Sequence, residues 1–237
     1  MRFYLVIPIV ILLTIYHSIS SMISIMIDRS GKGYHRVLRR WSRNLLWLFG
    51  IKTGLRGAEN LDPSTHYVFL ANHSSYLDII ALGATIPDDI RFIFKKELAK
   101  IPIFGWGLAM GPYILIDRTD ARNAMASIEN AASQIREGAS VVIFPEGTRT
   151  PDGKLGPFKR GGLMLATKSG VPMVPVAIIG TYQLLSRHDS RVRPGKVEVI
   201  IGTPIAGKRD MNRAEETAMQ NEIHAQLERL LESGRRG

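Results

Sequence analysis

The chain has 237 residues, of which 45% are hydrophobic, and a net charge of +10 at neutral pH. This length suits one large domain or one domain with an appendage, and the composition is that of a chain that buries a core, which excludes a disordered protein. There is no cysteine, so thiolate nucleophiles, disulfides and thiolate metal sites are excluded, and the chain fits a reducing compartment.

The positive charge is concentrated near the N-terminus. Residues 1–50 hold 7 Lys and Arg and 1 acid, whereas residues 51–207 hold 18 and 14, and residues 208–237 hold 6 and 6. The basic excess therefore lies beside the most hydrophobic part of the chain. Because a nucleic-acid binder spreads its basic residues over a polar surface, this pattern indicates anionic membrane lipids as a partner and argues against nucleic acid.

Residues 3–27 form an uninterrupted stretch without Lys, Arg, Asp or Glu. As a helix this stretch is roughly 37 Å long, enough to cross a hydrocarbon core of about 30 Å. A cleaved signal peptide is disfavoured, since no small-residue cleavage pattern closes the run. Pro8 and the polar stretch 17–21 leave two alternatives: a transmembrane helix, which the sequence favours, and a helix or hairpin lying in one leaflet.

The next segment, residues 33–50, predicts an amphipathic helix. One face carries apolar residues at helical spacing, and the opposite face carries four arginines: Arg36, Arg39, Arg40 and Arg43. A helix docked on a core with a solvated basic face is one interpretation. Trp41 and Trp47, close behind a hydrophobic stretch, favour the other, a helix at anionic headgroups. The basic residues also predict that the following chain lies on the cytoplasmic side of the inner membrane.

From residue 51 onward, short β-type runs alternate with helix-type segments. Strands are expected at 67–71, 91–94, 113–116, 140–144, 173–179 and 196–201, and helices at 76–84, 121–136, 160–168 and 213–232. This alternation predicts an α/β fold: a mixed, largely parallel sheet flanked by helices, preceded by the N-terminal membrane-anchoring helical segment.

The first candidate site is the break between the run 67–71 and the following helix. His73 ends the strand, and Asp78 lies in the first turn of the helix. This placement lets a carboxylate hold one imidazole nitrogen and leave the other free to take a proton. The alternative interpretation is that Asp78 only serves the helix N-terminus and His73 is an ordinary loop residue.

Two further strands also run into polar turns. The run ending near residue 144 is followed by Glu146, Gly147, Thr148 and Arg149, of which the last three offer backbone, hydroxyl and guanidinium donors that suit a phosphate; a solvated turn is the alternative. The strand 113–116 is followed by Arg118, which is either a second arginine for a phosphate at a strand end or part of an ordinary surface pair with Asp117. The chain lacks a P-loop, a nucleophile elbow, a zinc-hydrolase motif and a dinucleotide fingerprint, so these enzyme classes are unsupported.

Four segments together resemble the bacterial 1-acylglycerol-3-phosphate acyltransferases within the glycerolipid acyltransferase family. They are NHSSYLD, GPYILIDR, FPEGTRT and VPMVPV, in the family's order and spacing over roughly residues 51–205. The third block carries Thr150 where the family often has serine. The VPMVPV segment, by itself, is explained by structure, since its prolines stiffen the entry to a buried strand.

The resemblance implies transfer of a fatty acyl group from acyl-CoA or acyl-carrier protein to the sn-2 hydroxyl of lysophosphatidate, giving phosphatidic acid. It implies that His73 is the general base and that Asp78 orients it, with no metal and no cofactor beyond the donor. The substrate phosphate would be framed by Arg118, Glu146, Gly147, Thr148 and Arg149. Lys95 and Lys96 are further candidates for phosphate binding, between which the sequence does not choose.

We accordingly expect residues 1–50 to form a membrane anchor and basic amphipathic helix, and residues 51–237 to form the catalytic domain. Two rival functions stay open. The first is an acyltransferase of the same superfamily that uses another lysophospholipid or a lyso-amino-lipid. The second is a non-catalytic module that binds anionic lipids through its arginines and does not need His73.

Overall fold

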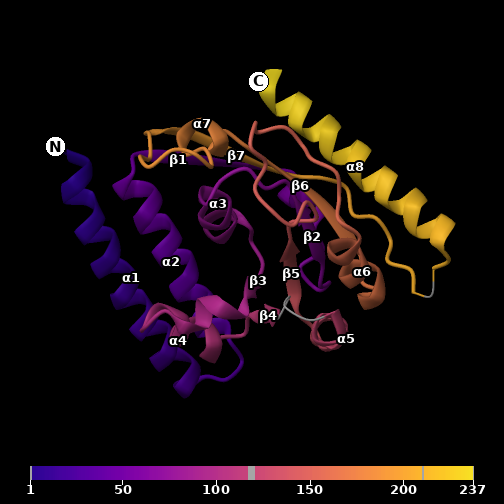
Figure 1. The fold of residues 1–237 in the computed structure, drawn as a ribbon, viewed down its shortest axis with the longest axis horizontal. Coiled ribbons are helices and arrows are strands. Elements are labelled where there is room, and N and C mark those ends of the chain that lie inside the picture. The colour runs from indigo at the N-terminus through magenta and orange to yellow at the C-terminus, as the bar shows by residue number, and fades with distance from the viewer. Residues whose placement is uncertain (1, 117–120, 210, 237) are drawn as a thin grey trace.

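The computed structural model describes residues 2–116, 121–209 and 211–236, which form an α/β fold around one seven-stranded sheet (Figure 1). The strands lie in the order β1-β7-β6-β2-β5-β3-β4, and every neighbouring pair is parallel except β6 and β7. The predicted mixed, largely parallel sheet is therefore confirmed. The strands are β1 (Ile51–Arg56), β2 (Val68–Ala71), β3 (Ile90–Lys95), β4 (Ile114–Ile116), β5 (Ser140–Ile143), β6 (Met173–Ile179) and β7 (Gly195–Ile201).

Helices cover both faces of the sheet. They are α1 (Arg2–Ile27), α2 (Lys32–Leu48), α3 (Leu77–Thr85), α4 (Phe104–Met110), α5 (Ala121–Arg136), α6 (Arg160–Ser169), α7 (Thr181–Leu184) and α8 (Arg213–Arg236), with short 3₁₀ turns η1 (Ala58–Asn60) and η2 (Lys96–Lys100). In Figure 1, α1 to α4 lie on one side of the sheet and α5, α6 and α8 on the other.

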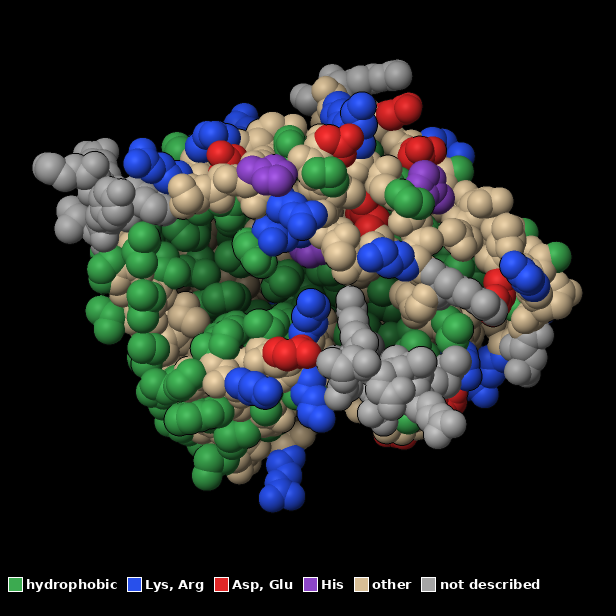
Figure 2. All heavy atoms as spheres, in the orientation of Figure 1, with side chains coloured by type: hydrophobic (Ala, Val, Ile, Leu, Met, Phe, Trp, Pro, Cys, Tyr) green, Lys and Arg blue, Asp and Glu red, His purple; other side chains and the backbone are tan. Residues whose placement is uncertain are grey.

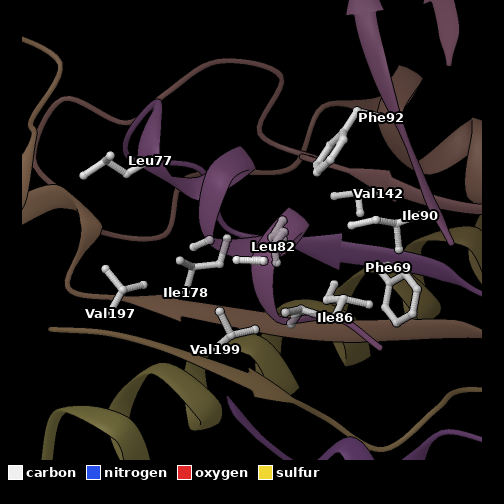
Figure 3. Packing of buried hydrophobic residues seen from close by; sticks show 14 of the residues in the cluster. Phe69, Leu77, Leu82, Ile86, Ile90, Phe92, Val142, Ile178, Val197 and Val199 are labelled. Atoms are coloured by element: carbon white, nitrogen blue, oxygen red, sulfur yellow. The ribbon is translucent and has the colours of Figure 1, made fainter. Parts of the chain in front are cut away.

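The two faces of the sheet belong to two separate apolar cores. In β2, Phe69 packs into the core beneath α2 and α3, whereas Val68 and Leu70 pack into the core beneath α5, α6 and α8. Figure 3 shows the first core, in which Leu82 of α3 lies among side chains from several strands. Because successive strand residues point to opposite faces, a strand covered on both sides reads as one continuous apolar run.

The long N-terminal helix α1 is partly covered by protein. Its stretch Val6–Ile27 is long and apolar enough to cross a membrane, a test that a core helix or a signal sequence also passes. On its inner side Thr14 accepts a hydrogen bond from the Trp41 indole (3.2 Å), and His17 pairs with Asn44 at 3.1 Å. His17 thus faces α2, Ser18 and Ser21 are buried against Gly107 of α4, and the outer side of α1 stays apolar and exposed.

The second helix, α2, is packed rather than laid on the surface. Tyr34 and Leu46 belong to the first core, and Ser42 is fully buried where α2 meets Gly83 of α3. Of its four arginines, Arg39 donates to backbone carbonyls between α3 and β3 (3.1 and 3.2 Å), and the other three are exposed. The structure therefore has the docked helix with a basic outer face.

Candidate active site

The candidate base lies just beyond the carboxyl end of β2. His73 Nδ1 is 2.8 Å from Asp78 Oδ2, and that oxygen also accepts the backbone N–H groups of Ser74 (2.8 Å) and Ser75 (2.9 Å). Because a carboxylate only accepts hydrogen bonds, a neutral His73 carries its proton on Nδ1 in this contact. Nε2 then keeps its lone pair and is available to take a proton.

The carboxylate of Asp78 is completely buried, whereas the His73 side chain is 15% exposed. Three donors converge on one oxygen of Asp78, which fixes the carboxylate and, through it, the imidazole. Asp78 lies in the first turn of α3, and its carboxylate fastens the backbone of the loop before the helix, so closing that loop and orienting the histidine are one arrangement.

The segment after β5 forms a turn that is fastened to His73 from two sides. Glu146 Oε1 accepts the N–H of His73 (2.7 Å), and the N–H of Thr150 donates to the carbonyl of His73 (2.9 Å). Glu146 Oε2 accepts the N–H of Gly156 at 2.8 Å, and the whole side chain is 4% exposed. Burial raises the pKa of Glu146, and its hydrogen bonds to two backbone amides oppose that rise.

The structure thus places Glu146 inside the turn, while Thr148 is exposed and Arg149 half-buried. Gly147 has a φ of 72°, and its N–H donates to the carbonyl of Phe144 (2.9 Å), so a left-handed residue closes the turn. The guanidinium of Arg149 lies 3.6 Å above the ring of Tyr76, a cation–π contact that joins the turn to the start of α3.

Of the remaining candidates, Arg118 lies outside the described residues. Lys95 ends β3 and Lys96 begins η2, and both side chains are exposed. Since β3, β5 and β2 are parallel neighbours, Lys95 at the end of β3 and His73 after β2 lie at the same edge of the sheet. The structure therefore brings His73, Asp78 and the turn 144–150 together and leaves the two lysines at a neighbouring strand end.

An apolar cavity of about 350 Å³ lies between α1 and α2 on one side and α3, β3 and α4 on the other. Figure 2 shows a hollow lined by hydrophobic side chains beside α1 on this face of the molecule. Tyr76, which holds Arg149, is also part of the cavity wall. The other walls include Val37, Trp41, Phe92, Phe94 and Leu108. No motif indicated this cavity, because its lining comes from segments scattered between residues 14 and 113.

Comparison with known proteins gives a consistent result. A family model described as Acyltransferase matches residues 52–179. A 1-acyl-sn-glycerol-3-phosphate acyltransferase of Pseudomonas aeruginosa is 34% identical over 186 residues, which cover 76% of this chain and 71% of that protein. The chain belongs to the 1-acyl-sn-glycerol-3-phosphate acyltransferase family.

Other members of this acyltransferase family are longer than the chain. The chloroplastic enzyme BAT2 of Brassica napus is 36% identical over 188 residues, which are 78% of this chain and 54% of that protein. The chain therefore spans about half the length of the plant relatives that it matches. The crystal structure of the 1-acyl-sn-glycerophosphate acyltransferase PlsC from Thermotoga maritima matches 95% of both chains, with a TM-score of 0.76 and 28% identity.

The matches to this acyltransferase family cover different parts of the fold. The family model contains His73, Asp78 and the turn 144–150, but it begins after α2 and ends at β6. The structural match at 95% coverage extends the likeness to most of the chain.

Proposed function

We propose that the chain transfers a fatty acyl group from acyl-CoA or acyl-carrier protein to the sn-2 hydroxyl of 1-acylglycerol-3-phosphate, giving phosphatidic acid. The observation that carries the proposal is His73, whose Nδ1 is held by the buried Asp78, while Nε2 has no hydrogen-bond partner among the described residues. This arrangement lies in a member of the 1-acyl-sn-glycerol-3-phosphate acyltransferase family, next to a cavity suited to a hydrocarbon chain.

In the proposed reaction, Nε2 of His73 takes the proton of the acceptor hydroxyl as its oxygen attacks the thioester carbonyl carbon. The carbon–sulfur bond then breaks, and the imidazolium returns the proton to the leaving thiolate. A thioester is already activated, so one base suffices and no covalent enzyme intermediate is needed. Asp78 stabilises the imidazolium that forms between the two proton transfers.

The acceptor phosphate is proposed to bind at the turn 144–150, where Arg149 and Thr148 supply donors and Gly147 shapes the backbone. The buried carboxylate of Glu146 does not face the phosphate in this proposal. It accepts two backbone N–H groups and so fixes the turn relative to His73. Lys95, Lys96 and Arg118 remain candidates for the same phosphate. Holding the phosphate places the hydroxyl within reach of His73, which is a positioning effect.

The apolar cavity is proposed to hold a fatty acyl chain of one of the two substrates. Each CH₂ group that moves from water into such a cavity contributes about 0.8 kcal/mol. Filling the cavity with a larger side chain, such as Val37→Trp, should therefore shift activity toward shorter acyl chains. The exposed ring of Tyr76 links this cavity to the turn that carries Arg149.

We further propose that α1 lies in one leaflet of the inner membrane, with the catalytic domain on the cytoplasmic side. If α1 crossed the bilayer, α2 would be carried into the hydrocarbon with its exposed arginines, at a high cost in free energy. In this proposal residues 1–50 form the anchor and residues 51–237 the catalytic domain. The helix α2 joins them, since it packs on both α1 and α3.

The test is phosphatidic acid formation from oleoyl-CoA and lysophosphatidate in detergent by three purified proteins. We expect product from the unmodified chain and from His66→Ala, which removes an exposed histidine, and none from His73→Ala. Full turnover by His73→Ala would exclude it as the base. If the unmodified chain acylates another lysolipid and not lysophosphatidate, the acceptor assignment is wrong.

A further inference from the structure

The short helix α4 carries large apolar side chains on its outer surface. Trp106 is 53% exposed and Met110 44% exposed, and their i, i+4 spacing places them on one face of the helix. Ile101, just before the helix, is 44% exposed. The side chains that face inward, including Phe104 and Leu108, line the apolar cavity. The helix therefore has one apolar side toward the cavity and a second apolar side toward the surroundings.

The helix α4 packs directly against α1, which also carries an exposed apolar face. A Cβ added at Gly107 would lie 3.4 Å from Ser21 Oγ and 3.5 Å from Ser18, so the two helices meet there closely. The hydroxyl of Tyr34 donates to the carbonyl of Gly107 (2.9 Å), which ties α4 to α2 as well. Beyond this contact, α1 exposes one apolar face over its C-terminal half: Ile19, Ile23, Met26 and Ile27.

The backbone before α4 is held in a rarely populated conformation. Ile103 has φ 66° and ψ −60°, and it is the only residue other than glycine with positive φ in the described part of the chain. The N–H of Phe104 donates to the carbonyl of Pro102 (2.7 Å), which closes a three-residue γ-turn of the strained type. Strain of this kind persists where the surrounding structure imposes it and is often functional. Here the γ-turn reverses the direction of the chain, so that Ile101 is exposed and Phe104 lies in the cavity wall.

We propose that the segment 101–110 is a second membrane-binding element, which inserts Trp106 and Met110 into the same leaflet as α1. This inference rests on the membrane association in the proposed function and adds a separate contact to it. Figure 2 shows the hydrophobic side chains of α1 gathered along one side of the molecule. Lys95 precedes the η2 turn and Lys100 ends it; both are exposed and suit anionic headgroups, and a tryptophan prefers the headgroup level.

A bilayer fits this surface better than a second copy of the chain. Three side chains of this size cover at most a few hundred Å², well below the roughly 800 Å² per partner of a stable interface. Insertion would also place the wall of the cavity, which the inner side of α4 forms, at the membrane boundary. A lipid acyl chain would then reach the cavity without crossing water.

The absence of cysteine allows a single environment-sensitive fluorophore to be placed at chosen positions. We would label Met110→Cys on α4, Ile23→Cys on α1 and Ala218→Cys on the exposed side of α8, and add vesicles of phosphatidylcholine and phosphatidylglycerol. We expect a several-fold rise in emission at positions 110 and 23, quenched by nitroxide-labelled acyl chains, and no change at position 218.

A response at position 23 without one at position 110 would overturn the inference and leave the membrane association of α1 intact. No response at either position would overturn both. A response at position 110 that follows protein concentration in the absence of vesicles would assign the surface to a second copy of the chain and overturn the inference as well.

Placing negative charges on the outer side of α4 tests the inference independently of the fluorophore. Trp106→Glu with Met110→Glu should weaken vesicle binding roughly tenfold or more, since two large side chains lose their burial. Ala214→Glu with Ala218→Glu is matched in charge and spacing on exposed α8 and should leave binding unchanged. Acyl transfer to a short-chain acceptor in detergent should stay normal in both double variants. Unchanged vesicle binding by the α4 variant would overturn the inference.

Discussion

The imidazole of His73 lies face to face with the ring of Phe144, with centroids 4.1 Å apart and ring planes inclined by 19°. The two residues follow neighbouring parallel strands, in which Leu70 of β2 pairs with Ile143 of β5. Asp78 therefore restrains the imidazole within its own plane, and Phe144 restrains it from one face. Both restraints come from strand and helix ends, which are more rigid than a free loop.

Replacement of Phe144 by leucine should lower kcat roughly 2- to 10-fold, since an aromatic pair contributes about 0.5–1.5 kcal/mol beyond its burial. The acceptor KM should change little, because the ring orients the base and supplies no hydrogen-bond donor to the phosphate proposed at this turn. Phe144→Tyr keeps the ring face and should stay close to normal. Steady-state kinetics of both variants check this, and a loss confined to KM would contradict it.

Replacement of Asp78 by asparagine should lower kcat by about 10²–10⁴-fold, because the amide no longer holds the histidine with its free lone pair on Nε2. Circular dichroism should show a folded protein. Asp152→Asn changes an exposed aspartate in the loop after the turn and should have no such effect on kcat. Equal activity of the two variants would remove Asp78 from the mechanism.

Glu146 should make stability depend on pH. Its folded-state pKa is raised from the usual 4.5, so the folded chain holds this proton more tightly than the unfolded chain. This proton therefore stabilises the folded chain fully below pH 4.5, and the stabilisation is lost as the pH rises through the raised pKa. The difference in unfolding free energy between the unmodified chain and Glu146→Gln should therefore fall from about pH 4.5 upward. Urea unfolding across this range measures it, and a flat difference would contradict the expectation.

Alanine at Gly147 should destabilise the fold by about 1–2 kcal/mol, since its left-handed backbone disfavours a side chain. The added Cβ would also lie 2.9 Å from Cδ of Lys159. Gly161→Ala is the matched control, because it lies in α6 without positive φ and nothing would lie within 4 Å of its Cβ. Denaturant unfolding should separate the two variants, and equal stability would contradict this account of the turn.

Alanine at Arg149 should chiefly raise the acceptor KM, by roughly 10-fold or more, because a charge-assisted contact to phosphate contributes about 1.5–3 kcal/mol. Arg213→Ala removes an exposed arginine from α8 and should leave KM unchanged. The comparison uses lysophosphatidate in detergent for both variants. An unchanged KM for Arg149→Ala would exclude this residue from the phosphate site.

Most of the sheet could be predicted because its strands are buried on both faces and read as continuous apolar runs. The predicted strand at 173–179 coincides with β6, and the predicted helix at 121–136 coincides with α5. In contrast, β1 (Ile51–Arg56) was missed. It is an edge strand with mostly exposed side chains, so it lacks the apolar pattern that marks the others. The helix α4 was missed because it is short and contains two glycines.

The contact between His73 and Asp78 could be predicted because both lie within one local strand–helix break. The stack of Phe144 on His73 and the inward position of Glu146 could not, since they depend on which strands become neighbours. For the same reason the contacts of Trp41, which lines the cavity and donates to Thr14, could not be predicted, whereas Trp47 of the same helix is exposed. Periodicity shows which face of a helix is apolar but not what covers that face.

The edge strand β1 also determines when the sheet can be completed during synthesis. Its one neighbour is β7, and Ile51 pairs with Gly195, so the two strands that meet are far apart in the chain. While a ribosome is still making residues before 195, α1 and α2 are already outside it and β1 has no strand to pair with. The N-terminal helices therefore leave the ribosome before the sheet beside them can be closed. The pairing of β1 with β7 is then a late step of folding, because it joins segments that lie far apart in the chain.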